Sequence, residues 1–350
     1  MWSRLLLLSL AWVPLTNAIT HGHVVSRLSS PSTLLIHISR YFYTSTGRRR
    51  RRSDYCTGTL ITKQVVITAG HCLSGKFGSN VSVKFIEKQR TLLFRSVRSY
   101  YVIRSELEPL DGVKTAHLES MSPKSASSSW RFLFSAVSIG SSVRSSARRR
   151  NLAPENKNMK RNASSDVALL LLSNPIEVCN AAKRSPQSHF EILRLPMSTG
   201  VWNRVEDAHC TLFGYGRSEE RQRKLDLNLR RMKVRLHKVK KPYLKMKLGR
   251  RQKICEGDSG SPVVCVHQGI RYLIGISTSV QSTESSDKPQ LCGMRTKRDD
   301  SQYAIITSAK FYDVREGISE IFKFLKAHNQ IDSFVADYNK CFYGNDLANI

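Results

Sequence analysis

Three short segments carry residue types that together can attack a carbonyl carbon. They are Val66-Ile-Thr-Ala-Gly-His71-Cys72, Ser165-Asp166-Val-Ala-Leu-Leu and Cys255-Glu-Gly257-Asp258-Ser259-Gly260-Ser-Pro262. The hydroxyl of Ser259 is a poor nucleophile at neutral pH unless a base takes its proton during attack, and the imidazole of His71 is best suited to take it. A buried carboxylate such as Asp166 fixes the imidazole tautomer and stabilises the imidazolium that forms.

The glycine-rich turn around Ser259 meets a further requirement. Backbone N–H groups beside the serine must point at the oxyanion that develops during attack, and Gly257 allows a close approach there because it has no Cβ. A lone histidine is more often structural than catalytic, and a lone Gly-Asp-Ser-Gly is often just a turn. The chain order His71, Asp166, Ser259, with cysteines beside two of the three segments, is much more specific.

With these segments the chain resembles the chymotrypsin-like serine proteases. The matches are Thr-Ala-Gly-His-Cys, Asp-Val-Ala-Leu-Leu, Gly-Asp-Ser-Gly-Ser-Pro and Cys210-Thr-Leu-Phe-Gly-Tyr-Gly216, the last with tyrosine where the family has tryptophan. The resemblance covers about residues 19 to 328. It implies His71 as general base, Asp166 as its orienting group and Ser259 as nucleophile, with the N–H groups of Gly257 and Ser259 as the oxyanion hole. The implied reaction is peptide hydrolysis through an acyl-enzyme.

The family implies an all-β fold: two six-stranded antiparallel β-barrels with the active site between them, and a closing C-terminal helix. On that basis residues 19–330 form the protease domain, followed by a C-terminal tail at 331–350. The first barrel is expected over about 19–200, the second over about 201–313 and the helix over about 314–328.

The hydrophobic pattern supports this organisation independently. Val81–Phe85 alternates with period two, as a half-buried strand does. Pro262–Val266 and Tyr272–Ile276 are short apolar runs typical of buried strands, and Asp166–Leu172 is similar, although its pattern also allows a helix. Only Val314–His328 carries the apolar stripe of an amphipathic helix.

Two stretches have the composition of surface insertions. Arg48–Arg52 is an unbroken run of five arginines, and Ser120–Arg150 is rich in serine and ends in three arginines. Both are interpreted as solvated loops, with a dedicated anion-binding site as the alternative.

Residues 1–18 have the pattern of a secretory signal peptide. Arg4 precedes a short apolar run, and the segment ends in the small-residue stretch Thr16-Asn17-Ala18. An uncleaved anchor is the alternative, although the run is shorter than the roughly twenty residues that span a bilayer. We therefore expect a secreted, extracellular protein in which the sequons at Asn80 and Asn162 are glycosylation candidates.

The eight cysteines are an even number, which favours disulfides in an oxidising compartment. The resemblance implies the pairs Cys56–Cys72, Cys210–Cys265 and Cys255–Cys292. Cys179 and Cys341 remain, and we predict that they pair and tie the chain after the helix to the first barrel. Two free or intermolecular thiols are the alternative.

The resemblance also raises the question of activation. In most relatives, cleavage exposes an apolar N-terminal residue whose ammonium inserts beside the aspartate that precedes the nucleophile, here Asp258. A buried carboxylate without such a partner is very costly. Signal cleavage after Ala18 would release Ile19-Thr-His-Gly22, which looks like the family's terminus. We therefore expect signal cleavage to expose Ile19 as the activating terminus, without a propeptide. Cleavage in the arginine run would leave too few residues before Cys56 for the new terminus to reach the second barrel.

The substrate pocket departs from the family pattern. Trypsin-like members carry an aspartate six residues before the nucleophile, where this sequence has Lys253. Because a cationic floor repels a cationic side chain, we expect a specificity that is not trypsin-like. Lys253 is expected either to bind an acidic side chain or to fill the pocket itself. On the wall strand, Thr278-Ser279-Val280 stands where the family has Ser-Trp-Gly, so that the valine narrows the entrance.

Composition bounds the possible functions. The chain has 350 residues, and 56 Lys+Arg against 27 Asp+Glu leave a formal net charge of +29. This surplus predicts attraction to polyanions such as nucleic acid, heparin-like glycosaminoglycan or anionic membrane. The composition excludes collagen, coiled coils and integral membrane proteins.

Two functions from different classes remain. The first is a secreted serine endopeptidase. The second is a cationic polyanion- or microbe-binding protein on a protease scaffold, with weak or no proteolysis, which the charge and the altered wall strand support. The intact triad favours the enzyme, because a pure binder needs none of its three groups. We expect a monomer with a protein or peptide substrate, no cofactor, no metal and no membrane span; His21-Gly-His23 is interpreted as part of an N-terminal strand.

Overall fold

The computed structural model of the chain describes ten stretches. They are residues 22–73, 80–87, 90–103, 165–180, 189–197, 202, 205–217, 227–249, 254–282 and 306–343. The expected signal peptide and the serine-rich stretch 120–150 lie outside the described residues.

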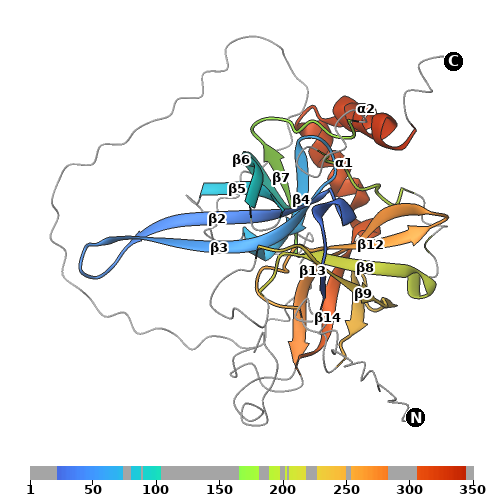
Figure 1. Ribbon diagram of the computed structural model, residues 1–350, viewed down its shortest axis with the longest axis horizontal. Coiled ribbons are helices and arrows are strands. Elements are labelled where there is room, and N and C mark those ends of the chain that lie inside the picture. The colour runs from blue at the N-terminus through green and yellow to red at the C-terminus, as the bar shows by residue number, and fades with distance from the viewer. Residues whose placement is uncertain are drawn as a thin grey trace, which may run out of the picture. The chain divides into compact units, whose positions relative to one another are not determined.

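The N-terminal half contains a closed antiparallel barrel with the strand order β2-β3-β4-β7-β6-β5 (Figure 1). Its strands are β2 Thr33–Tyr43, β3 Arg49–Leu60, β4 Val65–Ala69, β5 Asn80–Glu87, β6 Arg90–Ile103 and β7 Val167–Leu172. Alternate residues of each strand fill the interior, as Leu34, Ile36 and Ile38 of β2 do. Leu35 points the other way and joins a second cluster that reaches the other sheet and the helices.

Strand β7 resolves the ambiguity over Asp166–Leu172. All six residues of Val167–Leu172 are buried, because one face lines the barrel and the other packs outward against the second cluster. A strand buried on both faces needs apolar residues at every position, which is why its pattern also allowed a helix.

Seven strands of the C-terminal half and the N-terminal strand β1 form an eight-stranded antiparallel sheet in the order β1-β9-β8-β12-β13-β14-β11-β10. Its strands are β1 His23–Val24, β8 His209–Gly214, β9 Arg230–Val234, β10 His237–Lys238, β11 Tyr243–Lys247, β12 Pro262–His267, β13 Ile270–Ser282 and β14 Ile306–Asp313. The end strands β1 and β10 have two residues each. Buried side chains such as Leu212, Val263 and Phe311 form its core.

Two helices follow the second sheet. The 3₁₀ turn η6 Val314–Gly317 leads into α1 Ile318–Ala327, as expected, and α2 Ile331–Phe342 follows within the segment that was expected to be a tail. In α2, Phe334 and Asp337 are buried, and the Lys63 N–H donates to Asp337 Oδ2 at 2.8 Å. The shorter 3₁₀ turns are η1 Arg27–Ser29, η2 Gly70–Cys72 and η4 Val205–Asp207.

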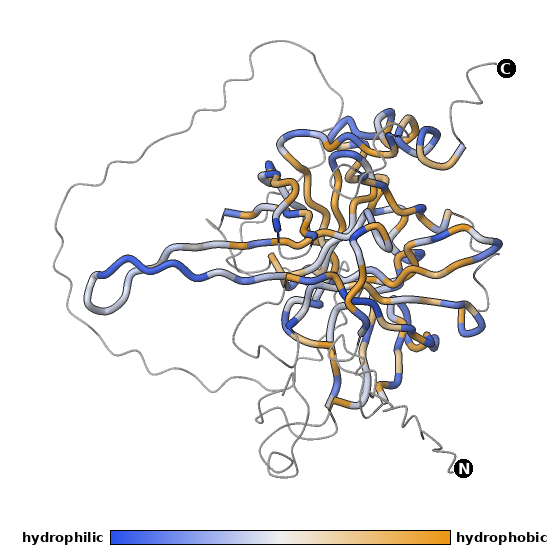
Figure 2. The backbone as a smooth tube through the Cα atoms, viewed as in Figure 1, coloured by the Kyte–Doolittle hydropathy of each residue, from blue (hydrophilic) through white to orange (hydrophobic). Residues whose placement is uncertain are grey.

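Two further expectations need correction. The arginine run is not a loop: Arg49–Arg52 begins β3 and pairs with the end of β2, and Figure 2 shows this hydrophilic stretch extending from the apolar strands of the barrel. The N-terminal segment does not belong to the first barrel, because β1 pairs with β9 of the second sheet. The fold class itself is confirmed as mostly β, with a closed barrel, a second sheet and C-terminal helices.

Candidate active site

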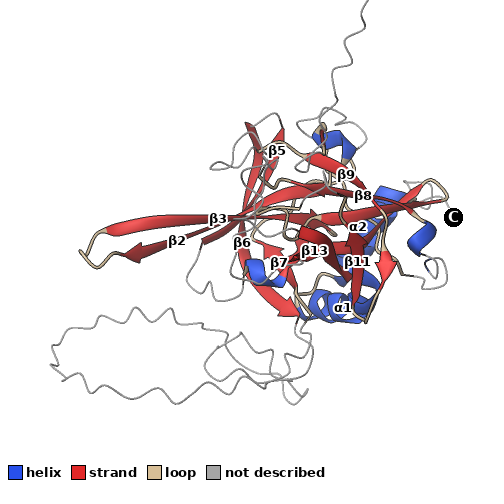
Figure 3. Cartoon of the chain, turned by 90° about the horizontal axis from the view of Figure 1, so that it is seen from below, coloured by secondary structure: helices blue, strands red, loops and turns tan. Residues whose placement is uncertain are grey.

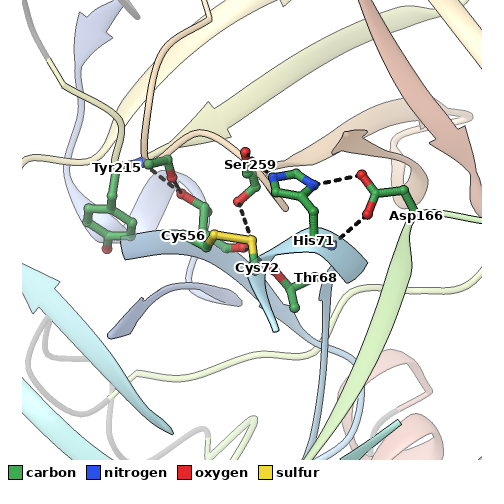
Figure 4. The surroundings of a disulfide bond; sticks show 9 residues. Cys56, Thr68, His71, Cys72, Asp166, Tyr215 and Ser259 are labelled. Atoms are coloured by element: carbon green, nitrogen blue, oxygen red, sulfur yellow. Dashed lines mark hydrogen bonds and ion pairs between the residues drawn. A yellow bond between two sulfur atoms is a disulfide. The ribbon is translucent and has the colours of Figure 1, made fainter. Parts of the chain in front are cut away.

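The pairing of β4 with β7 brings His71 and Asp166 together. Ala69 lies opposite Val167, so that η2, which begins just after β4, meets the residue just before β7. His71 Nδ1 lies 2.7 Å from Asp166 Oδ2, and the His71 backbone N–H donates to Asp166 Oδ1 at 2.6 Å (Figure 4). Two hydrogen bonds to one carboxylate fix both the backbone and the ring plane of the histidine.

Ser259 comes from the other half of the molecule, in the turn that precedes β12. Its Oγ lies 2.8 Å from His71 Nε2. The turn is held against β13 by the Gly260 N–H, which donates to the Ser277 carbonyl at 2.7 Å. Gly260 has a φ of +84°, and a Cβ on it would lie 2.1 Å from both the Thr57 carbonyl oxygen and Thr68 Oγ1. Only glycine fits this junction.

Two backbone N–H groups in this turn are available to an oxyanion. Gly257 has a φ of 96°, in the left-handed region. The Asp258 N–H, which lies between the two groups, donates to the Cys255 carbonyl at 3.0 Å. Within the described residues, the N–H groups of Gly257 and Ser259 donate to no protein acceptor. The sequence analysis expected these two N–H groups to form the oxyanion hole.

Thr57 on β3 is a residue of the site that sequence analysis did not single out. Its N–H donates to the Ser259 carbonyl at 2.8 Å, and its Oγ1 donates to the Gly257 carbonyl at 2.8 Å while accepting from the Tyr215 N–H at 3.1 Å. The side chain is completely buried. Its one sequence signal is its place directly after Cys56.

Two tyrosines of the second sheet reach the Asp166 segment and were also missed. Burial raises the pKa of Tyr312 on β14 to about 12 and raises the pKa of Tyr243 on β11 as well. The backbone of Asp166 acts to lower the pKa of Tyr243, and the Ser165 side chain acts to lower the pKa of Tyr312, so both phenols lie beside this segment. Because burial raises both pKa values, both phenols stay neutral beside the Asp166 segment.

Asp258 is completely buried beside the nucleophile. Its carboxylate accepts from the Gly216 N–H at 2.9 Å and from the Cys255 N–H at 3.0 Å. Burial raises the pKa of Asp258 to about 7, although these two hydrogen bonds and the charge of Arg230 oppose the shift. Ile19, the expected partner, lies outside the described residues.

The wall strand expected to line the substrate pocket is part of β13. Thr278 is buried, and its Oγ1 donates to the Lys310 carbonyl at 3.1 Å. The hydroxyl is therefore hydrogen-bonded within the second sheet, between β13 and β14. Ser279 is exposed, and half-buried Val280 packs against the core of the second sheet. Lys253 lies outside the described residues.

Three disulfides join elements as expected. They are Cys56–Cys72, Cys179–Cys341 and Cys210–Cys265. Cys255 is also disulfide-bonded, and Cys292, its expected partner, lies outside the described residues. Of the two sequons, Asn80 is exposed at the start of β5, and Asn162 lies outside the described residues.

Other kinds of site have no counterpart in the part of the chain that the structure describes. No group of three His, Cys, Asp or Glu side chains there is arranged to hold a metal ion. Nor is any helix among the described residues long and apolar enough to cross a membrane. His23 is exposed on β1, and His21 lies outside the described residues.

The arrangement as a whole supports one kind of chemistry. A carboxylate, an imidazole and a hydroxyl lie in series at hydrogen-bond distance, which is the geometry for moving the serine proton to the imidazole during attack. The family model described as trypsin matches residues 21–118 and 125–297. A search of curated proteins finds no match. The match spans most of the chain, which therefore belongs to the trypsin family and has the scaffold of a chymotrypsin-like serine protease.

Proposed function

We propose that the protein is a serine endopeptidase that cleaves peptide bonds through an acyl-enzyme. The observation that supports this most directly is the series of short contacts, 2.7 Å from Asp166 Oδ2 to His71 Nδ1 and 2.8 Å from His71 Nε2 to Ser259 Oγ. In this proposal the Ser259 oxygen attacks the peptide carbonyl carbon, and His71 Nε2 takes the hydroxyl proton. Asp166 stabilises the imidazolium, and the N–H groups of Gly257 and Ser259 hold the oxyanion.

The second half of the cycle follows from the same groups. The imidazolium gives its proton to the leaving amine as the C–N bond breaks, which leaves an ester on Ser259. A water molecule then attacks that ester, and His71 takes a proton from the water. The imidazolium gives this proton to the Ser259 oxygen as the carboxylic acid product leaves. Each oxyanion-hole hydrogen bond contributes about 3–4 kcal/mol to the transition state.

The proposed specificity is not trypsin-like. Lys253 at the pocket floor disfavours cationic side chains and either binds an acidic side chain or fills the pocket, and Val280 narrows the entrance. The proposed activating terminus is Ile19, released by the signal peptidase and paired with Asp258. The protein is proposed to be secreted as a monomer, with Asn80 and Asn162 as glycosylation sites.

A fluorophosphonate probe tests the proposal without knowledge of the substrate. The protein beginning at Ile19 is expected to be labelled at one serine, and labelling is expected to vanish in Ser259→Ala. Ser261→Ala is the matched control, because this buried hydroxyl two residues away has no partner among the described residues. A wild-type protein that stays unlabelled overturns the proposal. Rapid cleavage after Arg or Lys in a peptide library overturns the proposed specificity.

The second candidate is a cationic binding protein on a protease scaffold. The net charge of +29 favours it, since a surplus of that size attracts polyanions irrespective of catalysis. Absence of labelling together with retention on immobilised heparin would favour this function over the enzyme.

A further inference from the structure

The β2–β3 hairpin continues past the barrel as a free two-stranded ribbon. Pairing runs from Thr33 opposite Thr59 to Tyr43 opposite Arg49, whereas β5 accompanies β2 only as far as Ser39. We call residues 40–53 the arginine ribbon; Figures 1 and 3 show it extending beyond the neighbouring strands. Residues 45–53 are all exposed.

Cationic side chains point to both faces of the arginine ribbon. Because side chains alternate along a strand, Arg49 and Arg51 share one face, about 7 Å apart, while Arg50 and Arg52 share the other. Arg52 Nε lies 3.3 Å from Asp54 Oδ1. Within the described residues, the other three arginines have no carboxylate partner, so their charge is not neutralised.

Two exposed tyrosines lie among the arginines of one face, and one of them stacks on an arginine. Tyr41 lies opposite Arg51 and Tyr43 opposite Arg49 across the ribbon, and their exposed fractions are 51% and 72%. The Arg49 guanidinium lies over the Tyr41 ring, 3.8 Å from its centroid. Such stacking orients a guanidinium plane while its N–H edges stay free to bind an oxyanion.

The cationic face continues onto the barrel. Burial, the charge of Lys84 and the charge of Arg51, in that order, lower the pKa of His37 to about 4. His37 is therefore neutral at physiological pH and adds no charge. Arg51 pairs with Tyr41 and Lys84 pairs with Leu35, and because residues 35, 37 and 41 alternate to the same side of β2, Arg51, His37 and Lys84 share one face of the sheet. The path of positive charge thus runs from Arg49 through Arg51 to Lys84.

We infer that the arginine ribbon is a binding site for a linear sulfated polysaccharide. Guanidinium groups bind planar pairs of sulfate oxygens with two parallel hydrogen bonds, and a row of them about 7 Å apart suits a chain with repeated charges. A flexible chain can contact both faces of a narrow ribbon, whereas a flat membrane can meet only one. Stacking of a nucleic-acid base on Tyr41 is disfavoured, because Arg49 already covers a face of that ring. This site goes beyond the proposed protease activity and does not depend on it.

Two triple variants of the full chain test the inference. The ribbon variant is Arg49→Gln, Arg50→Gln, Arg51→Gln. The control variant, Lys233→Gln, Lys247→Gln, Lys326→Gln, removes the same charge from exposed positions on β9, β11 and α1. Affinity for a size-defined heparin oligosaccharide is measured by fluorescence anisotropy over a series of NaCl concentrations. We expect the ribbon variant to bind about tenfold or more weakly, with a shallower salt dependence, and the control to stay within about twofold of wild type.

Several outcomes overturn the inference. Equal losses in the two variants would mean that binding follows net charge and not the ribbon. Unchanged binding by the ribbon variant would exclude the ribbon outright. Tighter, ribbon-dependent binding to single-stranded DNA or to vesicles rich in phosphatidylserine would assign the site to another class of partner. Circular dichroism checks that both variants fold. Because the binding measurement does not depend on catalysis, it remains a valid test even if the fluorophosphonate probe does not label the wild-type protein.

Discussion

The hydroxyl of Thr57 lies between two backbone groups of the nucleophile side of the site, the Gly257 carbonyl and the Tyr215 N–H. Thr57→Val keeps the shape of the side chain and removes both hydrogen bonds, and each buried group left without a partner costs about 1–3 kcal/mol. Because the turn that carries the oxyanion N–H groups is then held less firmly, we expect fluorophosphonate labelling of Ser259 to slow by about tenfold or more. The time course of labelling measures this.

A second threonine of β3 provides the control. Thr59 is also fully buried, but its hydroxyl has no partner among the described residues, so Thr59→Val is expected to label at the wild-type rate. Thr57→Ser, which keeps the hydroxyl, is expected to restore most of the rate. If Thr59→Val slows labelling as much, Thr57 acts only through general packing. Hydrogen exchange of residues 254–261 gives a readout that is independent of activity.

Asp258 makes stability depend on pH in a predictable direction. Burial raises its pKa in the folded state to about 7 from an ordinary value of 3.8. The folded chain therefore binds more protons than the unfolded chain between these values, so the stability contribution is complete below about pH 4 and is lost as pH rises to about 7. The loss is on the order of 4 kcal/mol when no terminal ammonium lies beside the carboxylate.

A terminal ammonium beside Asp258 removes this loss, because it favours the ionised carboxylate. We compare a chain that begins at Ile19 with one that begins at Ala18, whose ammonium is displaced by one residue. The melting temperature of the chain that begins at Ala18 is expected to fall from pH 4 to pH 7, and that of the chain that begins at Ile19 to fall much less. In the chain that begins at Ala18, Asp258→Asn is expected to remove most of this pH dependence of the melting temperature. Identical profiles for the two chains would show that Ile19 does not reach Asp258.

Helix α2 depends on contacts made far along the chain. Cys341 is bonded to Cys179 across 162 residues, Asp337 accepts from the Lys63 N–H, and the Arg194 guanidinium lies 4.5 Å from the centroid of the Phe342 ring. The double variant Cys179→Ala, Cys341→Ala is expected to lose about 2–4 kcal/mol of unfolding free energy. Urea unfolding measures the loss.

The same double variant separates the helix from the site. Hydrogen exchange in 331–342 is expected to rise, while labelling of Ser259 stays within about twofold of wild type, because none of the lost contacts involves the triad. Cys56→Ala with Cys72→Ala is the contrasting pair, since that disulfide lies beside His71 and its removal is expected to slow labelling. Equal slowing by both pairs would contradict this separation.

The elements show which features the sequence pattern can predict. His71, Asp166 and Ser259 were singled out because the chemistry demands particular residue types in local contexts. Strand β5 and helix α1 were predicted from the period of their apolar residues, whereas β7 and β12 showed only as short apolar runs, with a helix left open for β7. These signals are local, so they can be read without the fold.

The missed features depend on partners that are distant in sequence. The arginine run has no apolar alternation, and it is a strand because it pairs with β2 across the turn at 44–48. The position of helix α2 is determined by partners that are distant in sequence, namely the disulfide to Cys179 and the guanidinium of Arg194. Thr57 and Tyr243 are ordinary residues of strands, whose roles follow only from what lies opposite them in the other half of the molecule.

The two halves of the molecule meet at the proposed active site and hold its residues together. The first barrel contributes His71 and Asp166, and the second sheet contributes the turn with Ser259. A continuous buried cluster contains residues of the barrel, of the second sheet and of both helices. The reacting groups therefore keep their distances only while the halves stay docked.

Gly260 is where this docking is closest, and a pair of glycine variants isolates it. Gly260 and Gly269 both have positive φ, +84° and +76°, so alanine at either position costs about 1–2 kcal/mol in backbone conformation. A Cβ at Gly269 meets nothing within 4 Å, whereas one at Gly260 would lie 2.1 Å from atoms of Thr57 and Thr68 in the first barrel. We expect Gly269→Ala to show only the backbone cost.

Gly260→Ala is expected to lose more than about 4 kcal/mol, since it adds a clash across the junction to the same backbone cost. Because the turn must also shift, labelling of Ser259 is expected to slow by about a hundredfold or more, against no change in Gly269→Ala. Urea unfolding measures the loss of unfolding free energy, and the time course of labelling measures the rate. A Gly260→Ala protein too unstable to purify would itself agree with the expected loss of stability. Equal stability of the two variants, or normal labelling in Gly260→Ala, would mean that the halves can move apart at this turn without disturbing the nucleophile. The close approach would then have no part in holding the site.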